Sequence, residues 1–359
     1  MGDIKHGGDI YDTARRWGIS PYDILDFSAN INPLGMPPGL VQYLENNWQA
    51  VLHYPDPRYT QLYKALADYL DIDEGFIMLG NGAIDIIYDY MRVMKPERAL
   101  IPSPTFSEYK RAAAVAGAQA DIWPMAEGLA IDTDMLCAVL SRGKHDMLIL
   151  CNPNNPTGGL LDKAELTNIL DCAKRYGVNV LLDETFIEFT EDYPHTSMVD
   201  VLQYYPNLCI VRAFTKFFAM PGLRLGYCIA DRRVKEMMSD IQPPWRINAM
   251  AALAGTYALK SGQFMLQTRR FVKEQRYLLQ QRISTVDGML VYPSQANFML
   301  IKSQREYATA DLLQQHLMNY HILVRNASNF DGLNEYYIRV AVRDKAGNER
   351  LIKAIEGFV

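Results

Sequence analysis

Features that would assign this sequence to a protein class at once are scarce or missing. The 359 residues carry 36 basic and 41 acidic side chains, a formal net charge of −5 at pH 7. Because the two signs are intermixed, the charge pattern favours neither nucleic acid nor an anionic membrane surface as a partner. No apolar run approaches membrane-spanning length, and the first residues contain no apolar signal core. Internal repeats and low-complexity segments are also absent.

Cysteine is equally sparse. The five cysteines form no Cys-x-x-Cys pair, and they lie in apolar or helical contexts at positions 137, 151, 172, 209 and 228. This usage predicts reduced core thiols and a cytosolic protein, and we expect no metal site. The chain is too long for one ordinary core and suits two lobes.

Apolar runs and amphipathic stretches alternate through the first two thirds of the chain. This alternation predicts an α/β fold with a mostly parallel, doubly wound sheet. The runs typical of buried strands lie at 99–101, 120–123, 147–150, 178–182 and 207–214. The expected helices lie at 60–70, 84–93 and 161–175.

The pattern changes after Trp245. Residues 248 to about 281 are expected to be mostly helical, with a break near Ser261-Gly262, and to cross from one lobe to the other. A small α+β lobe should follow, with strands at 297–301, 322–325 and 336–342 and helices at 308–318 and 348–357. We therefore predict an N-terminal arm that belongs partly to the small lobe, a large domain and a small C-terminal domain, at residues 1–45, 46–245 and 246–359.

The most informative segment runs from Arg212 to Gly226 and contains Lys216 directly after a buried strand. Desolvation there disfavours the charge of the lysine and gives a neutral amine that can attack a carbonyl. Thr215 and Arg224 offer a hydroxyl and a planar set of donors that suit a phosphate. A nucleophilic amine beside a phosphate site is what pyridoxal 5'-phosphate requires. Taken alone, the segment is also compatible with a surface lysine and arginine near a turn.

Three further segments point to the same cofactor. Asp183 ends a predicted buried strand, where its carboxylate could pair with the pyridine nitrogen, although aspartate is also a common helix cap. Asn155, in Asn-Pro-Thr-Gly, lies in a turn after another strand and could present its amide to the 3'-oxygen. Gly80-Asn-Gly82-Ala83 opens a predicted helix, whose free N–H groups form an anion site.

The order and spacing of these four elements resemble the superfamily of pyridoxal-phosphate enzymes that includes aspartate aminotransferase. The resemblance covers nearly the whole chain and implies the aspartate aminotransferase-like transferase fold. It implies that Lys216 bonds covalently to the cofactor, that Asp183 holds the pyridine nitrogen and that Asn155 holds the 3'-oxygen. Phe106 matches the aromatic residue that stacks on the ring, and Tyr54 matches the tyrosine that reaches the phosphate of the neighbouring subunit in a homodimer. The residues implied for the phosphate are Gly82, Ala83, Thr215 and Arg224.

Two departures from the transaminase pattern bear on the reaction. Phe186 stands where many transaminases carry a tyrosine hydroxyl. The arm contains His6-Gly-Gly and Asn30-Ile-Asn32-Pro-Leu-Gly. With the segments at 244–249 and 336–343, the arm is similar to the family of L-threonine-O-3-phosphate decarboxylases of the cobalamin pathway. That resemblance implies decarboxylation of L-threonine O-3-phosphate to (R)-1-amino-2-propanol O-2-phosphate and CO2, with the product serving as the aminopropanol linker of cobalamin.

A decarboxylase must hold the substrate carboxylate out of the ring plane and anchor the substrate elsewhere. A phosphate at the far end is a suitable anchor, because remote binding energy can fix the orientation at the reacting carbon. Arg325, and His6 with Asn30 or Asn32, are candidate phosphate ligands, although Arg325 could also be a surface charge. Arg339 matches the family arginine that pairs with the substrate carboxylate. Asn155 borders the same site, and Arg343 is either a further ligand or a surface partner.

The sequence is also compatible with other functions. Histidinol-phosphate aminotransferase shares the cofactor site and a phosphorylated substrate, and L-serine O-phosphate could replace threonine phosphate. A non-catalytic regulator of the same fold, which usually carries a DNA-binding domain, is a third possibility that any turnover would exclude. Ala213 replaces a family Ser or Gly, so we expect weaker cofactor retention rather than an inactive enzyme.

Overall fold

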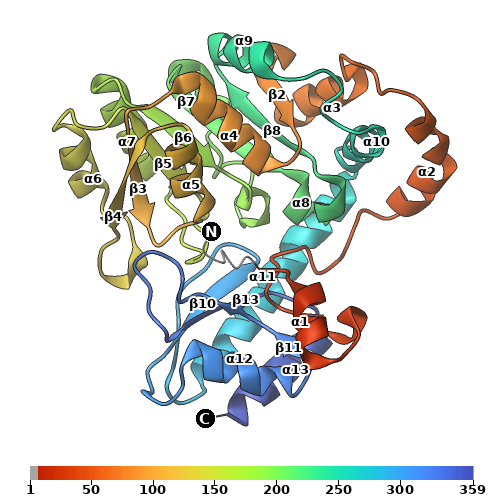
Figure 1. Cartoon of the computed structure of the whole chain (residues 1–359), viewed down its shortest axis with the longest axis vertical. Coiled ribbons are helices and arrows are strands. Elements are labelled where there is room, and N and C mark those ends of the chain that lie inside the picture. Colours follow the sequence, from red (N-terminus) through yellow and green to blue (C-terminus); the bar gives the residue numbers. More distant parts are fainter. Residues whose placement is uncertain (1–6, 359) are drawn as a thin grey trace.

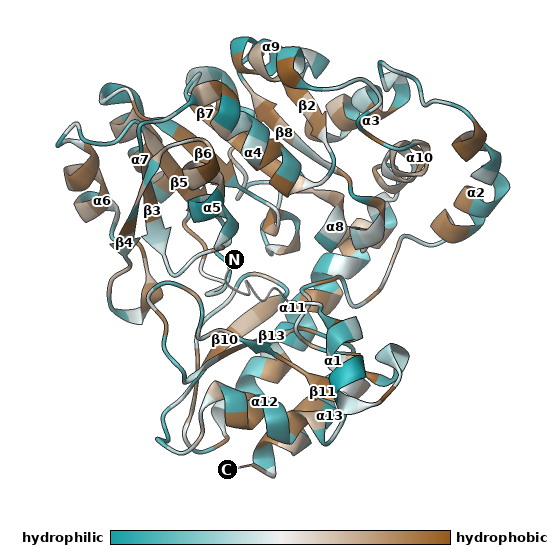
Figure 2. Ribbon diagram, in the orientation of Figure 1, coloured by the Kyte–Doolittle hydropathy of each residue, from teal (hydrophilic) through white to brown (hydrophobic). Residues whose placement is uncertain are grey.

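The computed structural model describes residues 7–358. Two lobes lie one above the other in Figure 1, and helix α11 (Gly262–Ser284) runs between them. The apolar strands lie inside each lobe, and the helices turn their polar faces outward (Figure 2). This distribution is expected for an α/β protein with a covered sheet.

The large lobe is built on a seven-stranded sheet with the order β2-β8-β7-β6-β5-β3-β4. Its only antiparallel pairings are those of β8 with β2 and β7, so the predicted mostly parallel sheet is confirmed. The strands are β2 (Ile77–Gly80), β3 (Arg98–Ser103), β4 (Gln119–Pro124), β5 (Met147–Cys151), β6 (Asn179–Asp183), β7 (Leu208–Ala213) and β8 (Gly226–Ala230).

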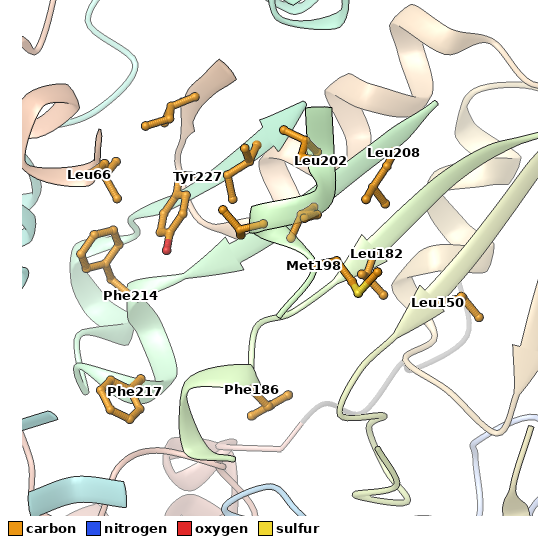
Figure 3. Packing of buried hydrophobic residues seen from close by; sticks show 14 of the residues in the cluster. Leu66, Leu150, Leu182, Phe186, Met198, Leu202, Leu208, Phe214, Phe217 and Tyr227 are labelled. Carbon is orange, nitrogen blue, oxygen red and sulfur yellow. The ribbon is translucent and has the colours of Figure 1, made fainter. Parts of the chain in front are cut away.

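Helices cover both faces of this sheet, as a doubly wound fold requires. One face packs against α4 (Ala83–Met94), α5 (Glu108–Val115) and α9 (Arg232–Ile241). The other packs against α3 (Thr60–Leu70), α6 (Thr133–Leu140) and α7 (Lys163–Arg175). Figure 3 shows part of this second core, in which Leu150 and Leu182 lie on the neighbouring strands β5 and β6, and Tyr227 lies on β8 of the same sheet. Helix α7 begins at Lys163 rather than at the predicted 161, because Asp162 and Glu165 form a capping box.

The small lobe has a four-stranded antiparallel sheet with the order β12-β13-β10-β9. The N-terminal arm joins this lobe through β1 (Leu25–Asp26), which pairs in parallel with β11 (Ile322–Leu323), and thus packs as predicted. The predicted α+β character is confirmed. The other elements are α1 (Ile10–Trp17), β9 (Met289–Val291), β10 (Phe298–Ser303), α12 (Ala310–Met318), β12 (Arg325–Asn326), β13 (Tyr337–Ala341) and α13 (Lys345–Glu356).

Two helices follow Trp245, as predicted. Helix α10 (Ala249–Ala258) packs against α2 (Leu40–Asn46) and α3 beside the large lobe, and α11 then crosses to the small lobe (Figure 1). The domain boundaries at 45 and 246 stay predictions. Because the buried side chains of α10 belong to the core of the large lobe, we propose that the division falls within α11.

Between residues 7 and 358, no helix combines the length and apolar content that crossing a bilayer requires. All five cysteines are free thiols.

Candidate active site

A cavity of about 240 Å³ lies between the two lobes, at the carboxyl ends of β5, β6 and β7. Ligands bind at this edge in open α/β sheets. A larger hollow of about 840 Å³ beside α11 shares only Cys151 with it, so volume alone does not locate the site. Ten of the predicted site residues line the smaller cavity, namely Asn30, Ala83, Phe106, Asn155, Asp183, Thr215, Lys216, Arg224, Arg325 and Arg339.

Lys216 lies in the short helix α8 (Phe214–Phe217), which follows β7 without a loop. Burial lowers the pKa of its amine to about 8, and the nearby positive charges of Arg339 and Arg224 act in the same direction. A substantial fraction of the amine is therefore neutral near pH 8. The nucleophile predicted at this position has the protonation behaviour that an attack on an aldehyde requires.

The carboxylate of Asp183 lies on the same cavity wall at the end of β6. Its Oδ2 accepts a hydrogen bond from the Tyr109 hydroxyl at 2.7 Å, and its Oδ1 accepts one from the Thr185 backbone N–H at 2.8 Å. Burial nevertheless raises the pKa of Asp183 above its ordinary value. A buried carboxylate of this kind is stabilised by a positive partner, and a protonated pyridine nitrogen would supply one.

The end of the cavity next to α4 is suited to a phosphate. Helix α4 has no side-chain cap, so backbone N–H groups of its first turn remain available to an anion. Gly82 precedes it with φ +90°, and a Cβ there would lie 2.6 Å from Nη2 of Arg224. A Cβ on Gly226 would lie 2.7 Å from the backbone nitrogen of Ala83. The absence of a side chain at Gly82 leaves room for Arg224, and its absence at Gly226 leaves room for the first turn of α4. Both groups can therefore approach the same anion.

Aromatic rings and an amide border the middle of the cavity. The rings of Phe106 and Tyr109 meet edge to face at 5.5 Å, and Phe186 packs edge-on against Phe298 at 4.9 Å. Oδ1 of Asn155 accepts a hydrogen bond from Arg339. The amide group of Asn155 is thereby oriented, and its N–H groups are the donors that the cofactor's 3'-oxygen would need.

Two arginines line the small-lobe side of the cavity. Arg325 and Arg339 are 8% and 5% exposed, and neither pairs with a carboxylate within the described part of the chain. Burial lowers the pKa of Arg325 to about 10 and that of Arg339 to about 9. Nε of Arg339 has no hydrogen-bond partner among residues 7–358. Two buried guanidinium groups without counterions indicate a site for an anionic ligand.

Three of the other predicted residues do not line the cavity. The amide of Asn32 donates to the Phe217 carbonyl and to Oγ1 of Thr268, at 2.7 and 3.0 Å, so it ties the arm to α8 and α11 instead of facing the cavity. Asn32 therefore does not line the cavity, and its predicted substrate contact stays a prediction that this geometry does not support. Tyr54 is 79% exposed and stacks on Trp245. Gly82 directly precedes Ala83 at the start of α4 without lining the cavity itself, and His6 lies outside the described residues.

Other residues of the site were missed by sequence reasoning. Tyr109 follows Phe106 by three residues, a helical spacing that could have indicated a common face. Phe330 and Ser28 also line the cavity. The backbone carbonyl of Ser28 accepts a hydrogen bond from Arg339 at 2.7 Å. These contacts join segments far apart in the chain, and no local pattern indicates them.

Comparisons with known proteins identify a family for the chain. The family model for aminotransferases of classes I and II matches residues 22–355. The chain is 40% identical over 358 residues to the threonine-phosphate decarboxylase of Salmonella typhimurium, covering 99% of this chain and 96% of that protein. The crystal structure of L-threonine-O-3-phosphate decarboxylase from Porphyromonas gingivalis aligns with a TM-score of 0.82 and 29% identity, covering 92% of this chain and 98% of the other. A histidinol-phosphate aminotransferase from Clostridium acetobutylicum aligns with a TM-score of 0.87 and 32% identity, covering 92% and 98%.

Proposed function

The chain belongs to the family of class I and II aminotransferases, and we propose that it is a decarboxylase of L-threonine O-3-phosphate. The family cofactor is pyridoxal 5'-phosphate, and the residues at the cavity fit it. The observation that carries the proposal is the pair of buried arginines, in the cavity that contains Lys216, that no carboxylate among residues 7–358 pairs with. A substrate with two anionic groups, a carboxylate and a phosphate, would satisfy both.

When bound, the cofactor supplies an electron sink for the bond that breaks at the substrate Cα. Lys216 provides the amine that holds the cofactor. Asp183, oriented by Tyr109 and Thr185, would keep a proton on the ring nitrogen. The first turn of α4, Thr215 and Arg224 would bind the cofactor phosphate, and Asn155 would donate to the 3'-oxygen. These roles stay proposals that the geometry supports.

The substrate is oriented from the small lobe. Arg325 binds the phosphate and Arg339 the carboxylate, with Asn30 beside them, where its buried Oδ1 has no partner among the described residues. The Cα–carboxylate bond breaks, CO2 leaves, and Nζ of Lys216 delivers a proton to Cα. The amino group stays on the product, (R)-1-amino-2-propanol O-2-phosphate, which serves as the linker of cobalamin. Free threonine lacks the phosphate and should be a very poor substrate, because buried donors would stay unpaired.

The reaction class is tested by comparing three substrates under steady-state conditions. O-phospho-L-threonine, O-phospho-L-serine, and histidinol phosphate with 2-oxoglutarate would be assayed for CO2 and for amino-group transfer. We expect CO2 from the first. The serine analogue is a real competitor, because one methyl group contributes only about 1–3 kcal/mol in a pocket. Turnover of histidinol phosphate alone would replace the proposal with a transaminase.

We further propose a homodimer with shared active sites. Tyr54 is exposed and stacks on the exposed Trp245, and the segment before it exposes further apolar side chains at Trp48, Val51 and Leu52. Such a patch is typical of an interface, and a two-fold axis would bring Tyr54 to the cofactor phosphate of the second subunit. Mixing Tyr54→Phe and Lys216→Ala subunits should restore one intact site in each heterodimer. A mixture without recovered activity would contradict the shared site.

The five free cysteines support the cytosolic location that their sequence context predicts.

A further inference from the structure

Arg325 forms part of the wall between two hollows. One is the active-site cavity, and the other is a groove of about 970 Å³ on the small lobe, bordered by α1 and α12. Only Ser28 and Arg325 line both. The guanidinium of Arg325 can therefore be held from the outer groove while it faces a ligand in the cavity.

Within residues 7–358, the groups that accept hydrogen bonds from this guanidinium are neutral. Its Nη2 donates to Oδ1 of Asn329 at 2.7 Å, and its Nη1 donates to the backbone carbonyl of Asn326. The ring of Phe330 lies 5.2 Å from the guanidinium carbon. Neutral acceptors fix the direction of an arginine without cancelling its charge, whereas a carboxylate in the same place would form an internal ion pair.

We propose that Asn329 is a specificity-determining positioning residue, which holds Arg325 toward the substrate phosphate and leaves its charge free. This inference rests on the proposed function, because it gives Arg325 a phosphorylated substrate to bind. Asn329 itself touches no substrate. An aspartate has nearly the same shape and differs by one negative charge, so the choice of amide over carboxylate has a measurable consequence.

The loop that carries Asn329 is braced on both lobes. The backbone N–H of Ala327 donates to Tyr337 at 2.9 Å, and Ala327 and Phe330 are buried in the small lobe. On the other side, Asp331 pairs with Lys110 of α5 at 2.9 Å. The side chain of Asn329 thus starts from a fixed backbone, and little conformational entropy is lost when Arg325 binds an anion.

The test compares Asn329→Asp and Asn329→Ala with Gln315→Glu in the cofactor-loaded protein. Gln315 is an exposed residue in the same outer groove, so its variant adds the same charge and makes no contact with Arg325. Binding of inorganic phosphate is measured by calorimetry, and KM and kcat are measured with O-phospho-L-threonine. Because the cofactor occupies its own phosphate site in the loaded protein, the added phosphate does not bind there and can report on Arg325.

We expect Asn329→Asp to weaken phosphate binding about ten- to a hundred-fold. The new carboxylate would pair with Arg325 and compete with phosphate for it, and one hydrogen bond with a charged group corresponds to a change of this size. KM should rise by a similar factor, with a smaller change in kcat. Asn329→Ala should weaken binding less than Asn329→Asp, and Gln315→Glu should change it less than about two-fold. A merely structural role predicts the opposite order, with the alanine variant worse.

The proposal is overturned if Asn329→Asp binds phosphate as tightly as the unmodified protein, or loses no more than Gln315→Glu. Failure of the decarboxylase function has a different signature. In that case the unmodified protein would release no CO2 from threonine phosphate, while the phosphate titration would still report whether Asn329 controls the Arg325 site.

Discussion

Replacing Tyr109 by phenylalanine removes a single hydroxyl from the cofactor site. That hydroxyl donates to Oδ2 of Asp183 at 2.7 Å, and both residues are buried. A hydrogen bond to a charged group contributes about 1.5–3 kcal/mol. Because this bond lowers the pKa of Asp183 against the rise caused by burial, its loss should raise that pKa further. Asp183 would then hold the pyridine proton less well.

We expect Tyr109→Phe to lower cofactor affinity, turnover or both by about ten- to a hundred-fold. Cofactor affinity is measured by absorbance titration of the cofactor-free protein, and turnover by CO2 release. Tyr205→Phe is the matched control, since it removes a 2.9 Å tyrosine–aspartate bond to Asp171 that lies outside the cavity. If the two variants behave alike, or if Tyr109→Phe changes neither quantity by more than about two-fold, the assigned role of the Tyr109–Asp183 pair is wrong.

Three further predictions follow from the same site. In the cofactor-free protein, the rate at which pyridoxal phosphate attaches to Lys216 should rise with pH up to about 8 and level off above it. The lowered pKa of Lys216 leaves its amine neutral at higher pH. A rate that still rises at pH 10 would contradict this. Gly82→Ala should reduce cofactor affinity strongly, because its Cβ would lie 2.6 Å from Arg224. Gly117 is the control, since it has a similar φ of +85° and open space around it. Gly117→Ala should lower thermal stability and leave cofactor affinity unchanged. Arg325→Ala should raise KM for threonine phosphate and lower the ratio of kcat/KM for threonine phosphate to kcat/KM for free threonine. If this ratio does not change, another residue binds the substrate phosphate.

Much of the fold could be predicted because its signals are local. The strand before Lys216 is an uninterrupted apolar run, and it forms the fully buried β7. Asp183 ends such a strand, and Asn155 and Lys216 each follow one, so a parallel sheet brings them to one edge. Their convergence on one cavity could therefore be foreseen without coordinates.

Other parts of the site depend on tertiary contacts that leave no local trace. Asn32 was predicted as a substrate ligand, but its partners Phe217 and Thr268 lie 185 and 236 residues away. Whether a buried amide binds substrate or a backbone carbonyl cannot be read from its neighbours in sequence. Asn329 lies outside any helix or strand, so its contact with Arg325 has no periodic signal either.

The central claim is that the substrate loses its carboxylate and keeps its amino group. O-phospho-L-threonine would be incubated with the cofactor-loaded protein in D2O, and the product examined by mass spectrometry. Decarboxylation replaces the carboxylate with one solvent proton, so we expect aminopropanol phosphate with a single deuterium on the amine-bearing carbon. A phosphorylated 2-oxo acid that has lost the amino group and kept the carboxylate would contradict the account.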